Sequence, residues 1–175
     1  MEKINKRSRV QGLDLLLADP RFQVVDAATR KRLIELLSIR EFPAQPFDAV
    51  MSASPIDGLT VYNVETFARS LRLVQMKMTK KSIRNRALNG FLFTVSADEY
   101  AVAEALDYRY LFAFIVLNDD NDYERPFCEL LTLAEINDRT VSKRFRYNVD
   151  SKNDYVGTPK KELPWQIEAE LGEIE

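Results

Sequence analysis

Histidine is absent from the 175 residues of this chain, and cysteine occurs once, as Cys128. Without histidine, Ser-His-Asp and Cys-His catalysis are excluded, and so is histidine-ligated zinc. A single cysteine excludes an intramolecular disulfide and a thiolate zinc site, and it is typical of the reducing cytoplasm, where we expect the protein to be located. Any bound metal would therefore use oxygen ligands, which favours magnesium, manganese or calcium.

Long apolar stretches and the common nucleotide-binding loops are also missing. The longest apolar run, residues 110–117, is far too short to span a bilayer, and the charged start of the chain leads into no apolar run typical of a signal peptide. We find no Walker loop, no GxGxxG motif and no internal repeat. The sequence therefore predicts no membrane partner and no P-loop or dinucleotide site.

The composition fits one globular domain with appended segments. Apolar residues make up 46% of the chain, which is enough for a hydrophobic core. We expect a basic N-terminal arm with a short helix over 1–24, an α/β domain over 25–150 and an acidic, flexible tail over 151–175. The net charge is only −2, so nucleic-acid binding would depend on local clusters of basic residues.

The other predicted elements are arranged around residues 71–79. Alternation predicts a strand that points Val74 and Met76 toward the core, and Gln75 and Lys77 toward the other face. A buried lysine needs an anionic partner or a chemical role, because a lone buried charge is costly. The plainer alternative is that Gln75 and Lys77 are edge-facing surface residues.

The rest of the pattern predicts alternating helices and strands. Helices are expected in four places: 12–18, 26–39, 97–106 and 132–136. Strands are expected in three further places, 47–51, 91–95 and 109–117, and residues 143–149 are expected to be an edge strand or coil. Ser96 and Glu99 form a capping box at the start of the third helix. The strand at 109–117 is apolar on both faces, which predicts a place in the middle of a covered sheet.

Two interpretations of the segment before the central strand stay open. Residues 59–65 alternate weakly and would form a hairpin with the strand at 71–79. In the other interpretation, residues 64–71 form one or two turns of helix inside a long loop. The choice matters because it decides which aspartate lies beside Lys77.

Basic residues are concentrated in one part of the chain. No acidic residue occurs from Thr66 to Ala97, whereas seven basic residues do: Arg69, Arg72, Lys77, Lys80, Lys81, Arg84 and Arg86. The last four belong to a loop that follows the central strand. This loop is either a nucleic-acid-binding surface or an ordinary solvated loop.

Two short motifs resemble those of the PD-(D/E)XK nuclease superfamily. They are Pro55-Ile56-Asp57-Gly58 and Val74-Gln75-Met76-Lys77, and the second is similar to the Gln-x-Lys motif of the Mrr-like restriction endonuclease branch. The segment from Gly90 to Phe114 also resembles the strand, helix and strand that follow this motif. The resemblance covers about residues 25–137 and implies an α/β fold with a restriction-endonuclease-like mixed central sheet flanked by helices.

The resemblance also implies a function and a site. It implies a Mg²⁺- or Mn²⁺-dependent endonuclease that hydrolyses phosphodiester bonds in DNA, with a homodimer as one possible assembly. Gln75 would give the metal a neutral carbonyl oxygen, and Lys77 would orient the attacking water or hold the scissile phosphate. The acidic metal ligand would be Asp57 if 59–65 form the hairpin partner, or Asp48 if 54–70 are an insertion, and Asp57 is the favoured candidate. Two further acidic residues could lie near the metal: Glu35 and Glu65.

Two other functions are consistent with the same residues. Glutamine brings no negative charge, so the fold could be a degenerate nuclease that binds nucleic acid or an acidic protein through the loop at 80–86 without cleaving it. In the third hypothesis the acidic tail contacts a protein partner and is itself the functional part.

Overall fold

The computed structural model describes residues 6–39, 47–79, 88–117, 126–147 and 165–172. At its centre is a five-stranded mixed sheet with the strand order β1-β2-β3-β5-β6. Its strands are β1 (Phe22–Gln23), β2 (Ala49–Met51), β3 (Arg72–Thr79), β5 (Tyr110–Val116) and β6 (Phe127–Leu131). The expectation of an α/β fold with a mixed central sheet is therefore confirmed.

The direction of the strands follows from their connections. β1, β2 and β3 are antiparallel neighbours, whereas β3 and β5 run parallel. The crossover between the parallel strands contains β4 (Leu92–Ser96), α4 (Ala97–Leu106) and a 3₁₀ turn, η2 (Asp107–Arg109). β5 lies between β3 and β6 and is buried along its whole length, as we expected for a strand that is apolar on both faces.

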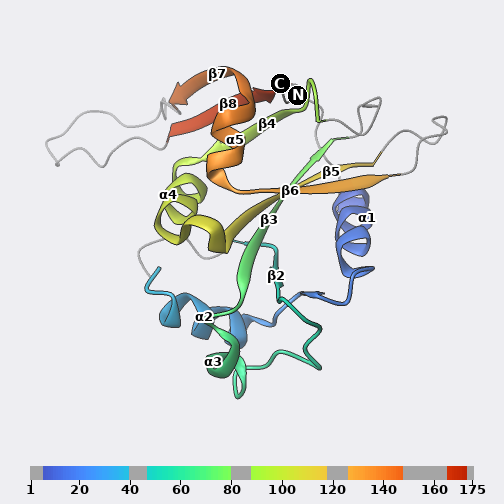
Figure 1. The fold of residues 1–175 in the computed structure, drawn as a ribbon, viewed down its shortest axis with the longest axis vertical. Helices are drawn as coiled ribbons and strands as arrows, with labels where there is room; N and C mark the ends of the chain where they lie inside the picture. Colours follow the sequence, from blue (N-terminus) through green and yellow to red (C-terminus); the bar gives the residue numbers. More distant parts are fainter. Residues whose placement is uncertain (1–5, 40–46, 80–87, 118–125, 148–164, 173–175) are drawn as a thin grey trace, which may run out of the picture.

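Helices cover both faces of the central sheet (Figure 1). α1 (Lys6–Leu17) lies on one face, where Leu16 packs with Val74 and Met76 of β3. α4 and α5 (Leu133–Arg139) lie on the other face, with α2 (Ala27–Leu36) and α3 (Val64–Phe67) toward the end at which β3 begins. Among the helices in the described ranges, none combines the length and the apolar composition that a membrane crossing requires.

A second, three-stranded sheet packs against the α4 and α5 side. Its order is β4-β8-β7, with β7 at Thr140–Tyr147 and β8 at Trp165–Leu171. Residues 165–171, which we expected in a flexible tail, therefore form the middle strand of a sheet. Ile167, Ala169 and Leu171 are buried and alternate with glutamine and glutamate, so one side of β8 joins the core. The strand expected at 91–95 is also present, but it belongs to this second sheet.

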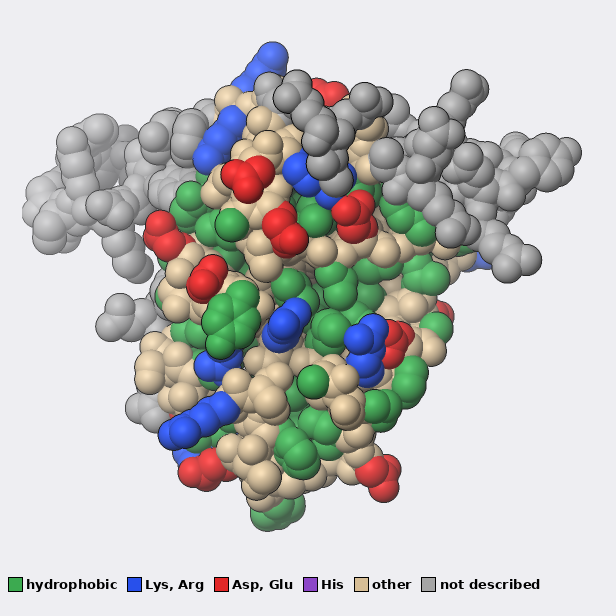
Figure 2. All heavy atoms as spheres, in the orientation of Figure 1, with side chains coloured by type: hydrophobic (Ala, Val, Ile, Leu, Met, Phe, Trp, Pro, Cys, Tyr) green, Lys and Arg blue, Asp and Glu red, His purple; other side chains and the backbone are tan. Residues whose placement is uncertain are grey.

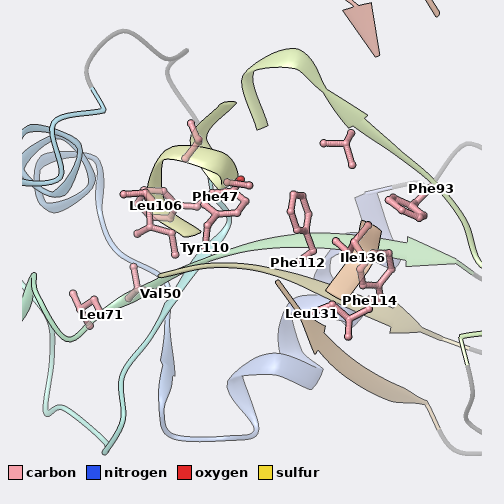
Figure 3. Packing of buried hydrophobic residues seen from close by; sticks show 14 of the residues in the cluster. Phe47, Val50, Leu71, Phe93, Leu106, Tyr110, Phe112, Phe114, Leu131 and Ile136 are labelled. Carbon is pink, nitrogen blue, oxygen red and sulfur yellow. The ribbon is translucent and has the colours of Figure 1, made fainter. Parts of the chain in front are cut away.

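An aromatic cluster joins the two sheets. Phe114 of β5 makes edge-to-face contacts with Phe91 and Phe93, at ring-centroid distances of 5.1 Å and 4.9 Å. Figure 3 shows Phe93 and Phe114 side by side within the main hydrophobic core. Such contacts are geometrically specific, so Phe114 fixes how β4 sits on the central sheet.

The segment that could be read in two ways has no strand at 59–65. It is a loop followed by the single turn of α3, so the helical interpretation is the better one. The Asn63 side chain organises this loop: it accepts the Thr60 N–H at 2.8 Å and donates to the Gly58 carbonyl at 2.9 Å. Local hydrogen bonds of this kind compete with strand pairing, which explains why the weak alternation did not form a hairpin.

Candidate functional site

The candidate site lies where β3 continues past the end of β2. The pairing of β2 with β3 reaches only to Val74, so β3 from Gln75 onward is paired on one side, with β5. Asp48, the residue before β2, occupies this edge: its Oδ2 accepts the Met76 N–H at 2.9 Å. Its carboxylate therefore lies beside the backbone between Gln75 and Lys77.

Two arginines flank the Asp48 carboxylate. Asp48 is 8% exposed at its side chain and forms an ion pair through Oδ1 with Arg9 of α1. Arg30 of α2 donates to the Phe47 carbonyl, and its Cζ lies 4.4 Å from the centre of the Phe47 ring. Burial lowers the pKa of Arg30, and the charge of Asp48 opposes this effect. Asp48 is thus a nearly buried anion in a positive environment.

Lys77 has the anionic partner that its position requires. Its Nζ lies 2.9 Å and 2.8 Å from the two carboxylate oxygens of Glu99, and the two side chains are 11% and 19% exposed. The ammonium also lies 5.7 Å from the centre of the Phe112 ring. Lys77 is therefore a largely buried cation held by its partner, and the alternative of an edge-facing surface lysine does not hold.

Glu99 has two roles, of which the sequence indicated one. Its Oε2 accepts the Ser96 N–H at 2.8 Å and its own N–H is bound by the Ser96 hydroxyl, as expected for a capping box. The same carboxylate holds Lys77. A signal for this second role exists, because Asp98 and Glu99 are the first acidic residues after the acid-free segment that contains Lys77.

Tyr110 links the two carboxylates electrostatically. It is fully buried at the start of β5, opposite Leu73. Burial raises the pKa of its hydroxyl well above the usual value, and the negative charges of Glu99 and Asp48 raise it further. Tyr110 and Phe47, the residue before Asp48, belong to the same hydrophobic cluster (Figure 3). Asp48 and the Lys77–Glu99 pair are therefore parts of one site.

Asp57 lies elsewhere. It is exposed in the loop after β2, and Gln23 of β1 holds this loop by bonds to the Ile56 carbonyl at 2.5 Å and to the Leu59 N–H at 2.9 Å. β1 is separated from β3 by β2. The structure therefore brings Asp48, and not Asp57, to Gln75 and Lys77.

The remaining predicted site residues are placed as follows. Gln75 is half-buried on β3, next to the Asp48 carboxylate along the strand. Glu35 and Glu65 both form ion pairs with Arg32 where α2 meets α3, at 3.4 Å and 2.9 Å. Four basic residues lie outside the described residues and stay a prediction: Lys80, Lys81, Arg84 and Arg86.

Asp48 and Gln75 are the residues of this site that could hold a metal ion. Within the described ranges, no group of three or more histidine, cysteine, aspartate or glutamate side chains could hold a metal. Asp48 and Gln75 nevertheless supply two hard oxygen donors, and Mg²⁺ is commonly held by one or two protein oxygens together with substrate phosphate and water. Oδ1 of Asp48 would first have to exchange its present partner, Arg9.

Charges of both signs are interspersed on the face that Figure 2 shows. Acidic side chains lie between the basic ones, and no single large basic field covers this face. Binding of a polyanion here would therefore depend on a few positioned cations rather than on the overall charge.

We expect the single cysteine to be chemically inert. Burial of Cys128 in β6, with a smaller effect of the Glu129 charge, raises its pKa from 9.0 to about 12. At pH 8 the native protein should therefore contain roughly a thousandfold less thiolate than an unfolded chain. Reaction with an aromatic disulfide reagent should be far slower in native buffer than in guanidinium chloride. Equal rates would show that the thiol is accessible and not perturbed.

Comparisons of the chain with family models, curated proteins and solved structures found no match. The function is therefore inferred from the geometry of Asp48, Gln75, Lys77 and Glu99 and from the charges around them.

Proposed function

We propose that this chain is a metal-dependent nuclease that hydrolyses phosphodiester bonds in DNA, with Asp48, Gln75 and Lys77 as its catalytic residues. The observation that carries the proposal is the position of the Asp48 carboxylate, which is bound to the Met76 N–H midway between Gln75 and Lys77. The antiparallel β2–β3 pair, followed by the crossover through α4 to the parallel β5, supports a restriction-endonuclease-like fold.

Each residue has a role that its surroundings support. Mg²⁺ or Mn²⁺ held by Asp48 and Gln75 would polarise the phosphate and acidify a bound water. Lys77 supplies a positive charge for the scissile phosphate or orients the attacking water. Glu99 is a positioning residue, because its two oxygens hold the Lys77 ammonium in place. A site of this kind cuts one strand, so a double-strand break would require two copies of the chain.

The choice between the two aspartates gives the direct test. We expect Asp48→Asn to reduce the Mg²⁺- or Mn²⁺-dependent nicking of supercoiled plasmid by at least about 100-fold, because the proposed acidic metal ligand is lost. Asparagine keeps an oxygen that can accept the Met76 N–H, so the fold should persist. Asp57→Asn, which makes the same change in the exposed loop, should nick at the wild-type rate.

Two results would contradict the assignment. Undiminished nicking by the Asp48 variant would exclude this carboxylate from catalysis. Loss of nicking in the Asp57 variant, with a normal circular dichroism spectrum, would show that the loop after β2 closes onto the site in the presence of DNA.

The second candidate is a binding module that no longer cleaves. It is favoured by the fact that donors within the protein engage both carboxylates: Arg9 and the Met76 N–H bind Asp48, and Lys77 and the Ser96 N–H bind Glu99. A site whose anions are already satisfied is stable without a metal. Salt-dependent DNA binding without any nicking by the wild-type chain in Mn²⁺ would support this candidate over the nuclease.

A further inference from the structure

The Arg9–Asp48 ion pair joins an exposed group to a buried one. The side chain of Arg9 is 61% exposed, whereas that of Asp48 is 8% exposed. An ion pair with an exposed arginine is weak and can be exchanged, because water and salt compete for the guanidinium. Arg9 is therefore able to leave Asp48 for another anion.

Arg30 provides a second guanidinium at the same place. Its aromatic stacking on Phe47 and its bond to the Phe47 carbonyl hold its plane fixed. These contacts use one of its nitrogens, and no other hydrogen bond of its guanidinium is found within the described part of the chain. Both Arg9 and Asp48 affect the pKa of Arg30 through their charges, so the three charged groups lie close together.

The local charge balance is positive. Among the described residues, Asp48 is the one carboxylate that pairs with Arg9 or affects Arg30, and the first turn of α1 contains no acidic residue. A helix N-terminus already carries partial positive charge, so the positive charge of Arg9 in this turn is intrinsically unfavourable. The place therefore has the charge that would attract a further anion.

The packing of α1 fixes Arg9 at this edge of the sheet. Gly12 lies one helical turn after Arg9, on the same face of α1. A Cβ on Gly12 would lie 2.4 Å from the Met78 sulfur of β3. Glycine thus allows α1 to approach the half of β3 that β2 does not cover, and this close approach brings Arg9 to Asp48.

We propose that Arg9 and Arg30 form a binding site for a phosphodiester group of the DNA backbone, and that Arg9 exchanges Asp48 for this phosphate when DNA binds. The planar guanidinium fork matches two phosphate oxygens, which makes arginine well suited to this contact. The exchange would also release Oδ1 of Asp48, the oxygen that the proposed metal requires. The assignment of this phosphate to DNA rests on the proposed function.

The test is DNA binding by the full chain without a divalent metal. Fluorescence anisotropy of a labelled DNA duplex, in EDTA and over a series of NaCl concentrations, gives the affinity and its salt slope. Arg9→Gln should weaken binding and reduce the slope by about one, as expected for the loss of one phosphate contact. Asp48→Asn should strengthen binding several-fold, because it removes a competing anion and frees Arg9. This gain should vanish in the double variant Asp48→Asn/Arg9→Gln.

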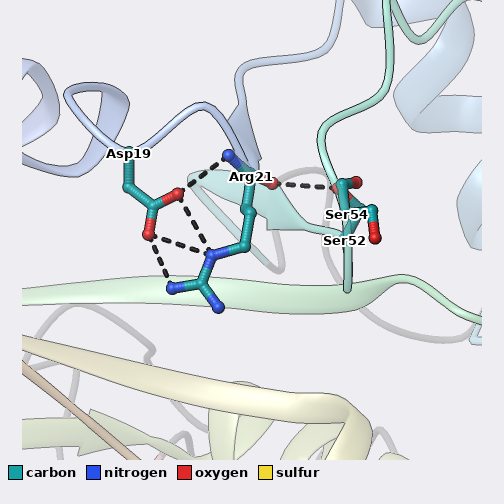
Figure 4. Close-up of polar contacts among 4 residues, drawn as sticks. All are labelled: Asp19, Arg21, Ser52 and Ser54. Carbon is teal, nitrogen blue, oxygen red and sulfur yellow. Dashed lines mark hydrogen bonds and ion pairs between the residues drawn. The ribbon is translucent and has the colours of Figure 1, made fainter.

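The pair Asp19–Arg21 offers a matched control. It is an arginine–aspartate ion pair at the other end of α1, with Arg21 Nη2 at 2.6 Å from Asp19 Oδ2 (Figure 4). The backbone of Arg21 also joins it to Ser52, by a bond from the Ser52 hydroxyl to the Arg21 carbonyl at 3.2 Å. Arg21→Gln changes the net charge as Arg9→Gln does, but should leave the salt slope unchanged. Asp19→Asn should give none of the gain expected from Asp48→Asn.

Three outcomes would overturn the inference: equal slopes for Arg9→Gln and Arg21→Gln, no gain in Asp48→Asn, or a gain that persists in the double variant. Thermal unfolding by circular dichroism checks that each variant is folded. Arg9→Gln is the decisive variant for the phosphate site, because the Arg9 side chain is exposed and its replacement should leave the fold intact. No assay here requires cleavage. If Arg9→Gln binds DNA as the wild type does, while the wild type nicks plasmid, only the phosphate site is refuted. If Arg9→Gln weakens DNA binding, while the wild type never nicks plasmid, only the nuclease proposal is refuted.

Discussion

Replacing Lys77 with methionine is expected to reduce metal-dependent nicking of supercoiled plasmid by at least about 100-fold. Methionine preserves much of the apolar stem that packs near Phe112, so the change chiefly removes the ammonium. Nicking by the variant at the wild-type rate would exclude Lys77 from the reaction. Glu99→Gln, which leaves the ammonium in place but removes the charge that holds it, should cause a smaller loss.

The stability of the Lys77 variant needs its own control. Lys77→Met leaves the Glu99 carboxylate nearly buried without its cation, and breaking such a pair from one side costs about 3–5 kcal/mol. The double variant Lys77→Met/Glu99→Gln should recover much of this free energy of unfolding while remaining inactive. Activity that returns together with stability in the double variant would mean that the pair is only structural.

The second large effect concerns the junction of the two sheets. We expect Phe114→Ala to lower the free energy of unfolding by about 3–5 kcal/mol, because a fully buried ring and two edge-to-face contacts are lost. Urea unfolding measures this change. Leu92→Ala is the control: Leu92 is 58% exposed on β4, so its truncation should change stability by less than about 0.5 kcal/mol.

Hydrogen exchange would show where the stability is lost. In the Phe114 variant the amides of β4 and β8 should exchange much faster than in the wild type, and those of β3 should change less. A loss of under about 1 kcal/mol would show that the two sheets are held together by other contacts.

Elements with strong local signals could be predicted from the sequence. β3 alternates along its length, β5 is apolar at each position, and Ser96 with Glu99 marks the start of α4. These signals depend on neighbouring residues alone, and the structure confirms all three elements. The need of Lys77 for an anion could also be stated, because the cost of a buried charge does not depend on the fold.

Features that depend on distant residues could not be predicted. The strand expected at 91–95 is present as β4, but its partner in the sheet is β8, some 70 residues later in the chain. The period-two pattern of β8 was present in Ile167, Ala169 and Leu171, but its many acidic residues made a solvated tail the simpler interpretation. The start of α1 was missed because its basic residues oppose the helix dipole, and tertiary contacts such as that between Gly12 and Met78 compensate.

For the same reason, only part of the candidate site could be predicted from the sequence. Gln75 and Lys77 lie on one strand, so their relation follows from the strand period. Between the two aspartates the sequence favoured Asp57, whereas the structure places Asp48 beside β3, because residues 59–65 do not pair with that strand. Arg9 and Arg30 gave no signal at all, because two helices far apart in the sequence bring them to Asp48.

The place of β8 has a consequence for how the protein is made. The central sheet is complete once residue 131 has been synthesised, and it can form while the chain is still being translated. The second sheet forms later, because its middle strand comes after residue 164 and both of its outer strands are made earlier. β4 therefore lacks its hydrogen-bonded neighbour during synthesis until β8 leaves the ribosome. A chain interrupted between residues 131 and 165 would present this apolar strand to chaperones and proteases while its candidate site is already formed.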